Sequence, residues 1–326
     1  MIQRRTTLQL AASMAMAATR LPVMAQAAYP NKPVKLLAGF PAGQATDVLG
    51  RALAAKLKDI LGQQFIVENK PGAAGIIATQ AVMTAPADGY TLLLTSSGPM
   101  AVNPGLYSKL PYDPVKDFVP VAALAMVPLV LVSNPNFPVT SVSELLALAK
   151  AKPGGINYAS AGSGVTNHLV MAMFCSATGI NMMHVPYKGG PPALTDLMGG
   201  QVNVMFETTV AALPFVKQGR LRALAVSSMK RSSAAPDVPT LNELGLTGFS
   251  GVPWVAIMAP AQTSTAIVTR LNAAINEALG SKELGDYFIA QGAETLIMSP
   301  GDLGAFTKTE IAKWGRAVKD SGAKVE

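Results

Sequence analysis

The chain contains few of the residues on which disulfide-stabilised proteins, metalloproteins and many enzymes depend. It has one cysteine, Cys175, and two histidines, His168 and His184, among 326 residues. A lone cysteine excludes an internal disulfide, and its apolar, helix-like surroundings favour a place in the core over a reactive thiol. Because no set of Cys, His, Asp and Glu has metal-ligand spacing, we expect core or capping histidines, no metal and no cofactor.

Charged residues are also scarce, at 14% of the chain, and the formal net charge is +7. Lys and Arg form no block and do not alternate with aromatic residues, so nucleic acid is not an expected partner. The sequence lacks Gly-Lys-Ser/Thr, which excludes a P-loop. The mild positive excess instead favours anionic ligands.

No run of apolar residues reaches the ~20 residues that a membrane-spanning helix needs. The first 27 residues combine a basic head, MIQRRTT, with a short, weakly apolar run and an Ala25-x-Ala27 end. This pattern is typical of an export signal that is cleaved near Ala27. A membrane anchor is the alternative, which the short run disfavours. The pair Arg4-Arg5 leaves the twin-arginine export route open beside the general one.

About 300 residues follow this segment, which exceeds a typical single domain and predicts two lobes. In the first part, apolar runs at 34–40, 65–68 and 90–95 indicate strands, and they alternate with helical patterns at 47–61 and 76–84. This β-α-β-α-β order is the unit of a parallel sheet that is covered on both faces.

The same alternation returns later in the chain. Further strands are expected at 156–159, 182–186, 202–206 and 221–227. The apolar run 118–134 accommodates one strand leaving the first lobe and one entering the second, and a strand at 254–258 is the return. The sequence therefore predicts an α/β fold of two lobes that form a hinged clamshell, with a mostly parallel sheet in each lobe and two crossings at the hinge. Residues 28–125 and 250–326 form the first lobe, and 126–249 the second.

The stretch GFPAGQATD, residues 39–47, joins the first expected strand to the first expected helix. In a parallel sheet such a loop faces the crevice in which ligands bind, and Gly43 permits a left-handed backbone. The start of a helix carries a partial positive charge and attracts anions. Thr46 or Asp47 is the expected cap of this helix. A plain turn with a cap is the simpler account of the loop taken alone.

A second loop of the same kind lies within NYASAGSGVTNHL, after the expected strand at 156–159. It is rich in small and hydroxylated residues, and it also precedes a helix start. Two such loops, one in each lobe, face each other across a cleft. That geometry suits a ligand with two carboxylates, or with one carboxylate and a polar tail.

Several motifs stand in order along the chain: FPAGQATD, NKPGAAG, YASAGSGVTNHL, HVPYKGGPPALTDLMGGQVNVMF and LRALAVSSMKRSSAAPDVPTLNELGLTGF. From about residue 29 to near the C-terminus, the chain therefore resembles the Bug/TctC family. These are periplasmic solute-binding proteins of tripartite tricarboxylate transport systems. The resemblance implies a two-lobed clamshell in the periplasm that binds a small carboxylate without chemistry and docks on membrane partners. We expect a monomer.

The resemblance carries ligand-binding roles to the matching positions of this chain. They are Phe40, Pro41, Ala42, Gly43, Gln44, Thr46 and Asp47 in the first loop, Ser96 and Ser97 after the third strand, and Ser160, Gly162, Ser163, Gly164 and Thr166 in the second loop. Tyr187, in the turn that also holds Lys188, is a further candidate at the rim or floor of the cleft.

Two positions depart from the family pattern, in which Gly is usual at 44 and Asp is frequent at 207. Gln44 adds a side-chain amide that either forms a further hydrogen bond or narrows the pocket. Glu207 repels a second carboxylate and accepts an ammonium group, which indicates an amino acid or a cationic ligand. A solvated or lysine-paired glutamate explains Glu207 equally well.

An enzyme is the main alternative class. Ser163 lies five residues before His168, but G-x-S-x-G is absent because Ala161 stands in place of its first glycine. No nucleophile, base and orienting group stand out, so we predict no catalytic residue. We predict instead that the chain captures a small organic carboxylate (a di- or tricarboxylate, an amino acid or an aromatic acid) for a tripartite tricarboxylate-type transporter. Ligand sensing through a membrane receptor is the alternative, and a hydrolase is the weakest one.

Overall fold

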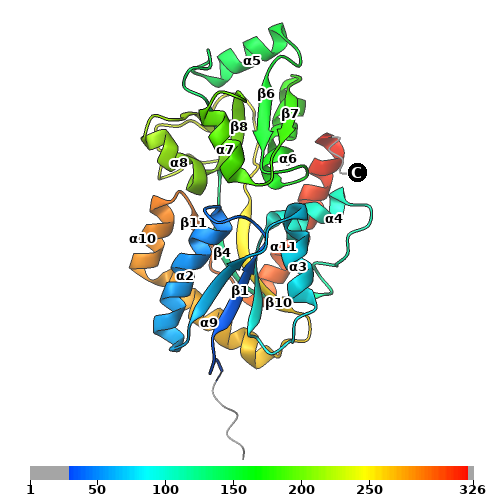
Figure 1. The fold of residues 1–326 in the computed structure, drawn as a ribbon, viewed down its shortest axis with the longest axis vertical. Helices are drawn as coiled ribbons and strands as arrows, with labels where there is room; N and C mark the ends of the chain where they lie inside the picture. The colour runs from blue at the N-terminus through cyan, green and yellow to red at the C-terminus, as the bar shows by residue number, and fades with distance from the viewer. Residues whose placement is uncertain (1–28, 322–326) are drawn as a thin grey trace, which may run out of the picture. The chain divides into compact units, whose positions relative to one another are not determined.

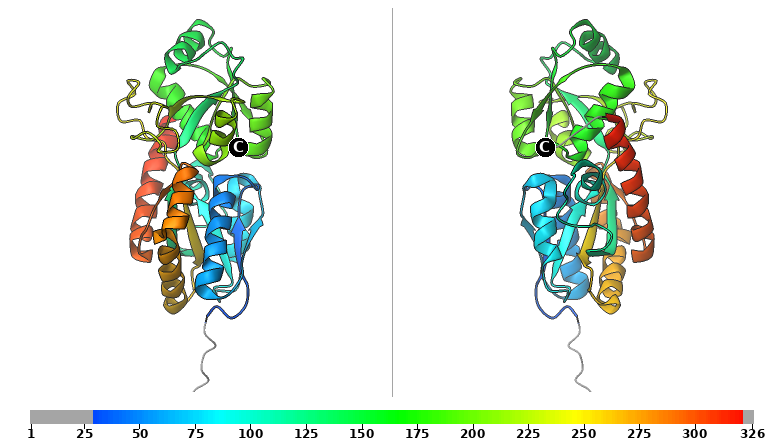
Figure 2. Two further views of the ribbon diagram at one scale, coloured as in Figure 1. Left: turned by 90° about the vertical axis from the view of Figure 1, so that its left-hand side faces the viewer. Right: turned by 90° about the vertical axis from the view of Figure 1, so that its right-hand side faces the viewer.

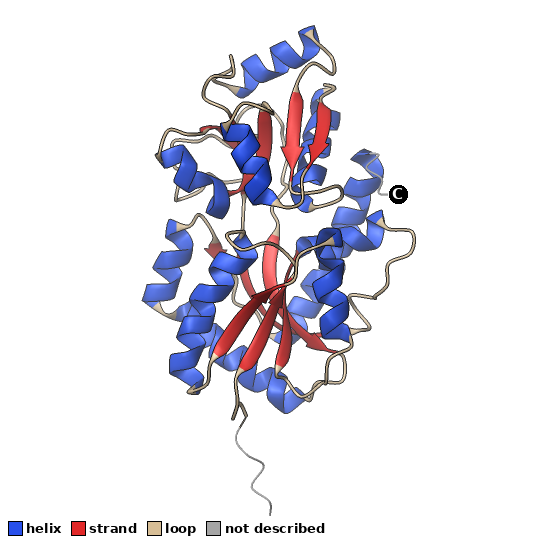
Figure 3. Cartoon of the chain, viewed as in Figure 1, coloured by secondary structure: helices blue, strands red, loops and turns tan. Residues whose placement is uncertain are grey.

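The structure is a computed structural model that describes residues 29–321. The expected export signal, residues 1–27, lies outside the described residues. Within residues 29–321, no helix combines the length and the apolar character needed to cross a bilayer. Two β-sheets form the framework, and helices cover both faces of each (Figure 1, Figure 3). The chain is therefore α/β, as the alternation of strands and helices predicts.

The first sheet has six strands in the order β11-β4-β10-β3-β1-β2. They are β1 (Val34–Ala38), β2 (Phe65–Asn69), β3 (Thr91–Ser96), β4 (Phe118–Met126), β10 (Trp254–Pro260) and β11 (Glu294–Thr295). Every residue of β10 is buried. A strand that is apolar along its whole length is typical of a sheet covered on both faces, and this explains why β10 shows no alternation of polar and apolar residues.

Helices α2 and α9 pack together on one face of the first sheet, and α3 and α11 lie on the other (Figure 1). The helical segments next to this sheet are α2 (Ala45–Leu61), η1 (Ala73–Gly75), α3 (Ile76–Met83), η2 (Gly98–Val102), α4 (Asn103–Leu106), α9 (Thr265–Gly280), α10 (Lys282–Ala290) and α11 (Pro300–Ser321). In α2, the fully buried Leu49, Leu53 and Leu57 recur at a helical spacing. They fix which face of the helix meets the sheet.

The second sheet has five strands in the order β7-β6-β8-β5-β9. Its elements are β5 (Leu129–Ser133), α5 (Val142–Ala151), β6 (Asn157–Ser160), α6 (Thr166–Thr178), β7 (Met183–Pro186), α7 (Gly190–Met198), β8 (Val204–Thr208), α8 (Thr209–Lys217) and β9 (Arg222–Val226). Val130 and Val132 pack with α7 and α8. Leu129 and Leu131 belong to a cluster with α5 and α6 on the opposite face, as the two-residue period of a strand requires.

The chain passes between the sheets where β4 leads to β5 and again after β9. Strands β4 and β9 precede the two crossings, and strands β5 and β10 follow them. Both following strands run antiparallel to their neighbours: β5 to β8 and β9, and β10 to β3 and β4. Both sheets are therefore mixed, although β1, β2 and β3 pair in parallel, as do β6, β7 and β8.

The two crossings lie side by side. Trp254 pairs with Met126 in the first sheet, and the N–H of Val127 donates to the carbonyl oxygen of Pro253 at 2.8 Å. A further contact joins elements of the two sheets, because the hydroxyl of Thr209, at the start of α8, donates to the carbonyl oxygen of Gly292 at 2.9 Å. Thr209 belongs to the second sheet's elements, whereas Gly292 precedes β11 of the first.

A buried polar cluster fixes the last helix to the first sheet. The side chains of Trp254 on β10 and Trp314 on α11 are fully buried. Both indole N–H groups donate to the same oxygen, Oε2 of Glu310, at 3.1 and 2.8 Å. The ring of Phe306 also packs edge-on against Trp254. One carboxylate thus satisfies two indole donors that no water reaches.

Candidate functional site

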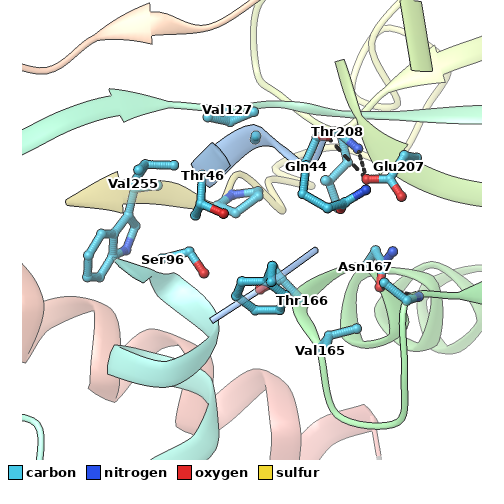
Figure 4. A pocket seen from close by; sticks show the side chains of 16 residues that line it. Gln44, Thr46, Ser96, Val127, Val165, Thr166, Asn167, Glu207, Thr208 and Val255 are labelled. Atoms are coloured by element: carbon cyan, nitrogen blue, oxygen red, sulfur yellow. Dashed lines mark hydrogen bonds between the residues drawn. The ribbon is translucent and has the colours of Figure 1, made fainter. Parts of the chain in front are cut away.

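A cavity of about 530 Å³, counted with its open mouth, lies between the two sheets. Its walls come from the first helical turns after β1 and β6, from the crossings and from the end of β8 (Figure 4). The lining residues are Phe40, Gln44, Ala45, Thr46, Ser96, Val127, Leu129, Ala161, Val165, Thr166, Asn167, Glu207, Thr208, Pro253, Trp254 and Val255. They include no Lys, Arg or His and a single acid, Glu207.

The first loop brings the start of α2 to this cavity. Gly43 has a φ of +83°, in the left-handed region, and Gln44 is the N-cap, without a side-chain capping bond. Thr46 and Asp47 therefore lie inside the first turn, and the prediction that one of them is the cap was wrong. The first-turn N–H groups of a helix have no acceptor within that helix. Thr46 adds a buried hydroxyl, 4% exposed, that forms no hydrogen bond in the described chain.

Asp47 is buried behind the loop and does not line the cavity. Its carboxylate accepts hydrogen bonds from the N–H of Gly43 at 3.0 Å, from Arg51 at 2.8 Å and from Asn69 at 3.0 Å. Burial by itself would raise the pKa of Asp47, but the bonds from Arg51, Gly43 and Asn69 outweigh it and hold the pKa below its usual value. Asp47 therefore remains charged and fixes the shape of the loop.

The second loop brings the start of α6 to the opposite wall. Val165 is the N-cap, again without a side-chain capping bond, and Thr166 and Asn167 follow it in the first turn. The Asn167 side chain accepts from the N–H of Ala161 at 3.3 Å. The hydroxyls of Ser97 and Thr166 approach to 3.4 Å, which places a direct polar contact between the two walls.

A stacked pair of histidines supports the second loop from behind. The rings of His168 and His184 lie 3.9 Å apart and nearly parallel, and Tyr158 stacks on His184. His168 Nδ1 accepts from the N–H of Gly164 at 3.0 Å, and His184 Nε2 lies 2.6 Å from Ser160 Oγ. His168 is buried and accepts a hydrogen bond from the loop, so it is a core histidine, one of the two predicted settings. Neither Ser160 nor His184 lines the cavity.

Protonation of this pair is unfavourable in the folded chain. Burial lowers the pKa of both histidines, and burial together with the charge of His168 lowers that of His184 to about 4. Between pH 6.5 and about 4 the unfolded chain therefore binds a proton that the folded chain does not. The His184 contribution to stability is complete above pH 6.5 and is lost as the pH falls through about 4.

We expect His184→Phe, which keeps a stacking ring but takes no proton, to gain stability relative to the native chain as the pH falls from 6.5 to 4. Urea denaturation at a series of pH values measures this difference. Ser160→Ala, which keeps both imidazoles, is the control and retains the acid dependence. Parallel curves for His184→Phe and the native chain would contradict the assignment.

Glu207 lines the cavity beside the start of α8. Its side chain is 1% exposed. Oε1 accepts from the N–H and the hydroxyl of Thr208, at 2.7 and 3.1 Å, whereas Oε2 has no hydrogen-bond partner in the described chain. Burial raises the pKa of Glu207 to about 7, against the opposing effect of Thr208. The interpretation of Glu207 as a solvated or lysine-paired side chain was wrong.

Gln44 and Glu207 come from opposite walls and meet at Gly190. A Cβ atom at position 190 would collide with Nε2 of Gln44 and lie only 2.7 Å from Oε2 of Glu207. Figure 4 shows the two side chains next to each other, with Thr208 bonded to the carboxylate. Glycine at position 190 therefore leaves the space that both side chains occupy.

The remaining candidates lie around this cavity rather than in it. A neighbouring hollow of about 1010 Å³, counted with its open mouth, is lined by Pro41, Gly162, Ser163 and Tyr187. It shares Phe40, Ala161 and Val165 with the first cavity. The hydroxyl of Tyr187 donates to Asp196 at 2.7 Å. The candidates that line neither space are Ala42, Gly43, Asp47, Ser97, Ser160 and Gly164.

The structure also adds residues that the motifs did not indicate. Val127, Leu129, Pro253, Trp254 and Val255 come from the crossings and form the apolar wall of the cavity. Their sequence signal was the continuous apolar character of 118–134 and of 254–258. That character identified the strands on either side of the crossings. Segments that connect two lobes pass beside the cleft between them and can form its wall.

Two α/β lobes joined by adjacent crossings, with a cavity between them at two helix starts, define a binding protein of the periplasmic type. Residues 49–323 match the family model described as TctC, tripartite tricarboxylate transporter family receptor, and the chain belongs to this family. It is 44% identical to protein BugT of Bordetella pertussis over 299 residues, which cover 91% of this chain and 92% of BugT. The predicted family is thereby confirmed.

Solved structures of relatives have the same fold. Rpa4515 of R. palustris with adipate is 36% identical, with a TM-score of 0.89 over 91% of this chain and 100% of that chain. The periplasmic binding protein BugD is 34% identical, with a TM-score of 0.87 over 91% and 100%. MatC from Rhodopseudomonas palustris with bound malate is 32% identical, with a TM-score of 0.84 over 89% and 100%. These high structural similarities confirm the fold class predicted from the sequence.

Proposed function

We propose that the chain is an extracytoplasmic solute-binding protein that captures a small organic carboxylate between its lobes for a tripartite tricarboxylate-type transporter. The observation that carries this proposal is the meeting of two uncapped helix starts, those of α2 and α6, at one cavity without a basic side chain. Backbone N–H groups at helix starts bind anions. The adipate bound to Rpa4515 and the malate bound to MatC support a carboxylate as the ligand.

The two lobes and the export signal have the boundaries that the sequence predicts. Residues 28–125 and 250–326 form one lobe and 126–249 the other, and residues 1–27 are removed when the chain is exported to the periplasm. Ligand contacts come from Phe40, Gln44, Thr46, Ser96, Thr166 and Glu207, the predicted residues that line the cavity. The other predicted residues shape the two loops or the neighbouring hollow.

Capture follows from closure of the lobes around the ligand. A carboxylate that accepts hydrogen bonds from both helix starts is bound more tightly when the walls are close than when they are apart. The ligand therefore shifts the population toward the closed form. The hydroxyls of Ser97 and Thr166 already join the two walls of the cavity in the described chain.

The test uses purified residues 28–326 in a thermal-shift screen of mono-, di- and tricarboxylates, amino acids, aromatic acids and sugars. A ligand at a hundred times its dissociation constant stabilises the folded chain by roughly 2.7 kcal/mol, which moves the melting temperature by a few degrees. We expect carboxylates to produce this shift, and mass spectrometry to recover them unchanged. A shift from sugars alone, or turnover of the bound compound, would overturn the proposal.

We expect Thr46→Val to weaken binding of the best carboxylate about tenfold, because the buried hydroxyl is replaced by a methyl group that forms no hydrogen bond. Isothermal titration calorimetry measures the effect. Thr84→Val, which changes an exposed hydroxyl at the end of α3, is the matched control and keeps the native affinity. Equal affinities for both variants and the native chain would remove Thr46 from the site.

A further inference from the structure

Two buried oxygens in the cavity lack hydrogen-bond partners in the described chain. They are Oε2 of Glu207 and Oγ1 of Thr46, on residues that are 1% and 4% exposed. A polar atom that is buried without a partner destabilises the folded chain. Such atoms at a ligand cavity indicate the chemistry of the group that completes them. Here the carboxylate oxygen of Glu207 requires a hydrogen-bond donor, and the hydroxyl of Thr46 can either donate or accept.

The charges around the cavity point in the same direction. Its lining contains one acid and no base, and no ion pair of Glu207 is found among the described residues. A second ligand carboxylate beside Glu207 would therefore face an uncompensated carboxylate. A cationic group would instead supply the missing partner, and it would remove the electrostatic penalty of burying the charge.

The available acceptors match an ammonium group better than a single-donor group. Gln44 is buried on the opposite wall, and its amide nitrogen Nε2, a donor, reaches the space beside Gly190 and Oε2 of Glu207 (Figure 4). The buried side-chain oxygens of the cavity that lack partners among the described residues are therefore Oε2 of Glu207 and Oγ1 of Thr46. A primary ammonium carries three N–H donors, whereas a hydroxyl has one.

We propose that the ligand is an amino carboxylate, with its ammonium group bound by Glu207 and its carboxylate at the helix starts of α2 and α6. This inference rests on the proposed function and names the class of carboxylate within it. Glu207 is then the residue that selects an amino acid over the corresponding plain dicarboxylate.

The experiment compares ligands that differ by the ammonium group alone or by its exchange for a carboxylate. The pairs are aspartate and succinate, glutamate and glutarate, 4-aminobutyrate and succinate, and 5-aminopentanoate and glutarate. Calorimetry at pH 8 measures each dissociation constant for the native chain, for Glu207→Gln and for Glu283→Gln. Glu283 is a surface acid, with a side chain 81% exposed, that pairs with Lys56, and it serves as the matched control.

In at least one pair, we expect the native chain to bind the amino member ten times more tightly or better. Glu207→Gln reduces this preference to twofold or less without weakening the dicarboxylate, and Glu283→Gln retains it. Dicarboxylates that bind more tightly than every amino member, or a preference that survives in Glu207→Gln, overturn the inference and leave the proposed function in place. If no carboxylate of either kind binds, the proposed function falls as well. Should Glu207→Gln not fold, the preference of the native chain alone decides.

Discussion

Glu207→Gln is expected to raise the free energy of unfolding of the ligand-free protein by about 3 kcal/mol above pH 7. Burial raises the pKa of this carboxyl from 4.5 to about 7, and each pKa unit corresponds to about 1.4 kcal/mol. Between these two values the folded chain keeps a proton that the unfolded chain has lost. The stability of the native chain therefore falls as the pH rises through this window, whereas glutamine has no proton to lose.

Urea denaturation of both chains between pH 4 and 8 measures this effect. The difference between them should be small below pH 4.5, where Glu207 is protonated in both states, and reach its full size above pH 7. Glu283→Gln, on the surface, should show no such rise. If the difference in unfolding free energy between the two chains stays constant with pH, Glu207 has its ordinary pKa in the folded chain. Its carboxylate would then be stabilised despite the unpartnered Oε2.

Glu310→Ala is expected to cost about 4 kcal/mol of stability. The Glu310 carboxylate is the acceptor for the indole N–H groups of both Trp254 and Trp314, and both indoles are fully buried. Its removal leaves two buried donors without a partner, at about 1–3 kcal/mol each. Glu310→Gln keeps an oxygen in the same place and should lose less than half as much.

Tryptophan fluorescence during urea denaturation is a direct readout, because Trp254 and Trp314 are the two tryptophans of the chain. Equal losses for Glu310→Ala and Glu310→Gln would show that the packing of this side chain matters rather than its hydrogen bonds. A loss below about 1 kcal/mol for Glu310→Ala would show that water replaces the carboxylate.

The sequence predicted most of the fold because its apolar runs are short and well separated. The run 118–134 resolves into β4 and β5, and the expected return is β10. The short strand β11 carried no signal, since its two exposed residues, Glu294 and Thr295, are placed by pairing with β4. Strands β5 and β10 run antiparallel to their neighbours because each follows a crossing. The periodicity of residues along a strand does not encode this direction.

The candidate site was predictable only where it depends on local motifs. Gly43 and the start of α2 are features of one loop, and the residues themselves indicated them. The burial of Glu207 depends on Gln44 and Gly190, which are brought to it from two other elements. The stacking of His168 on His184 likewise joins a helix to a strand across sixteen residues. Burial and stacking of this kind arise from tertiary packing. The sequence therefore shows which residue stands at a position but does not predict its surroundings.

The adjacent crossings have a consequence for how such a gene is assembled. Every strand pair of the six-stranded sheet joins residues that lie before 127 or after 253, and Met126 is already paired with Trp254. The codons for the second sheet are therefore a single insertion into a hairpin of the first. Exchange of that insertion for another would leave each ladder of the recipient sheet intact. One recombination step can thus replace the cavity wall that the second sheet's elements supply, while the pairing of the first sheet stays the same.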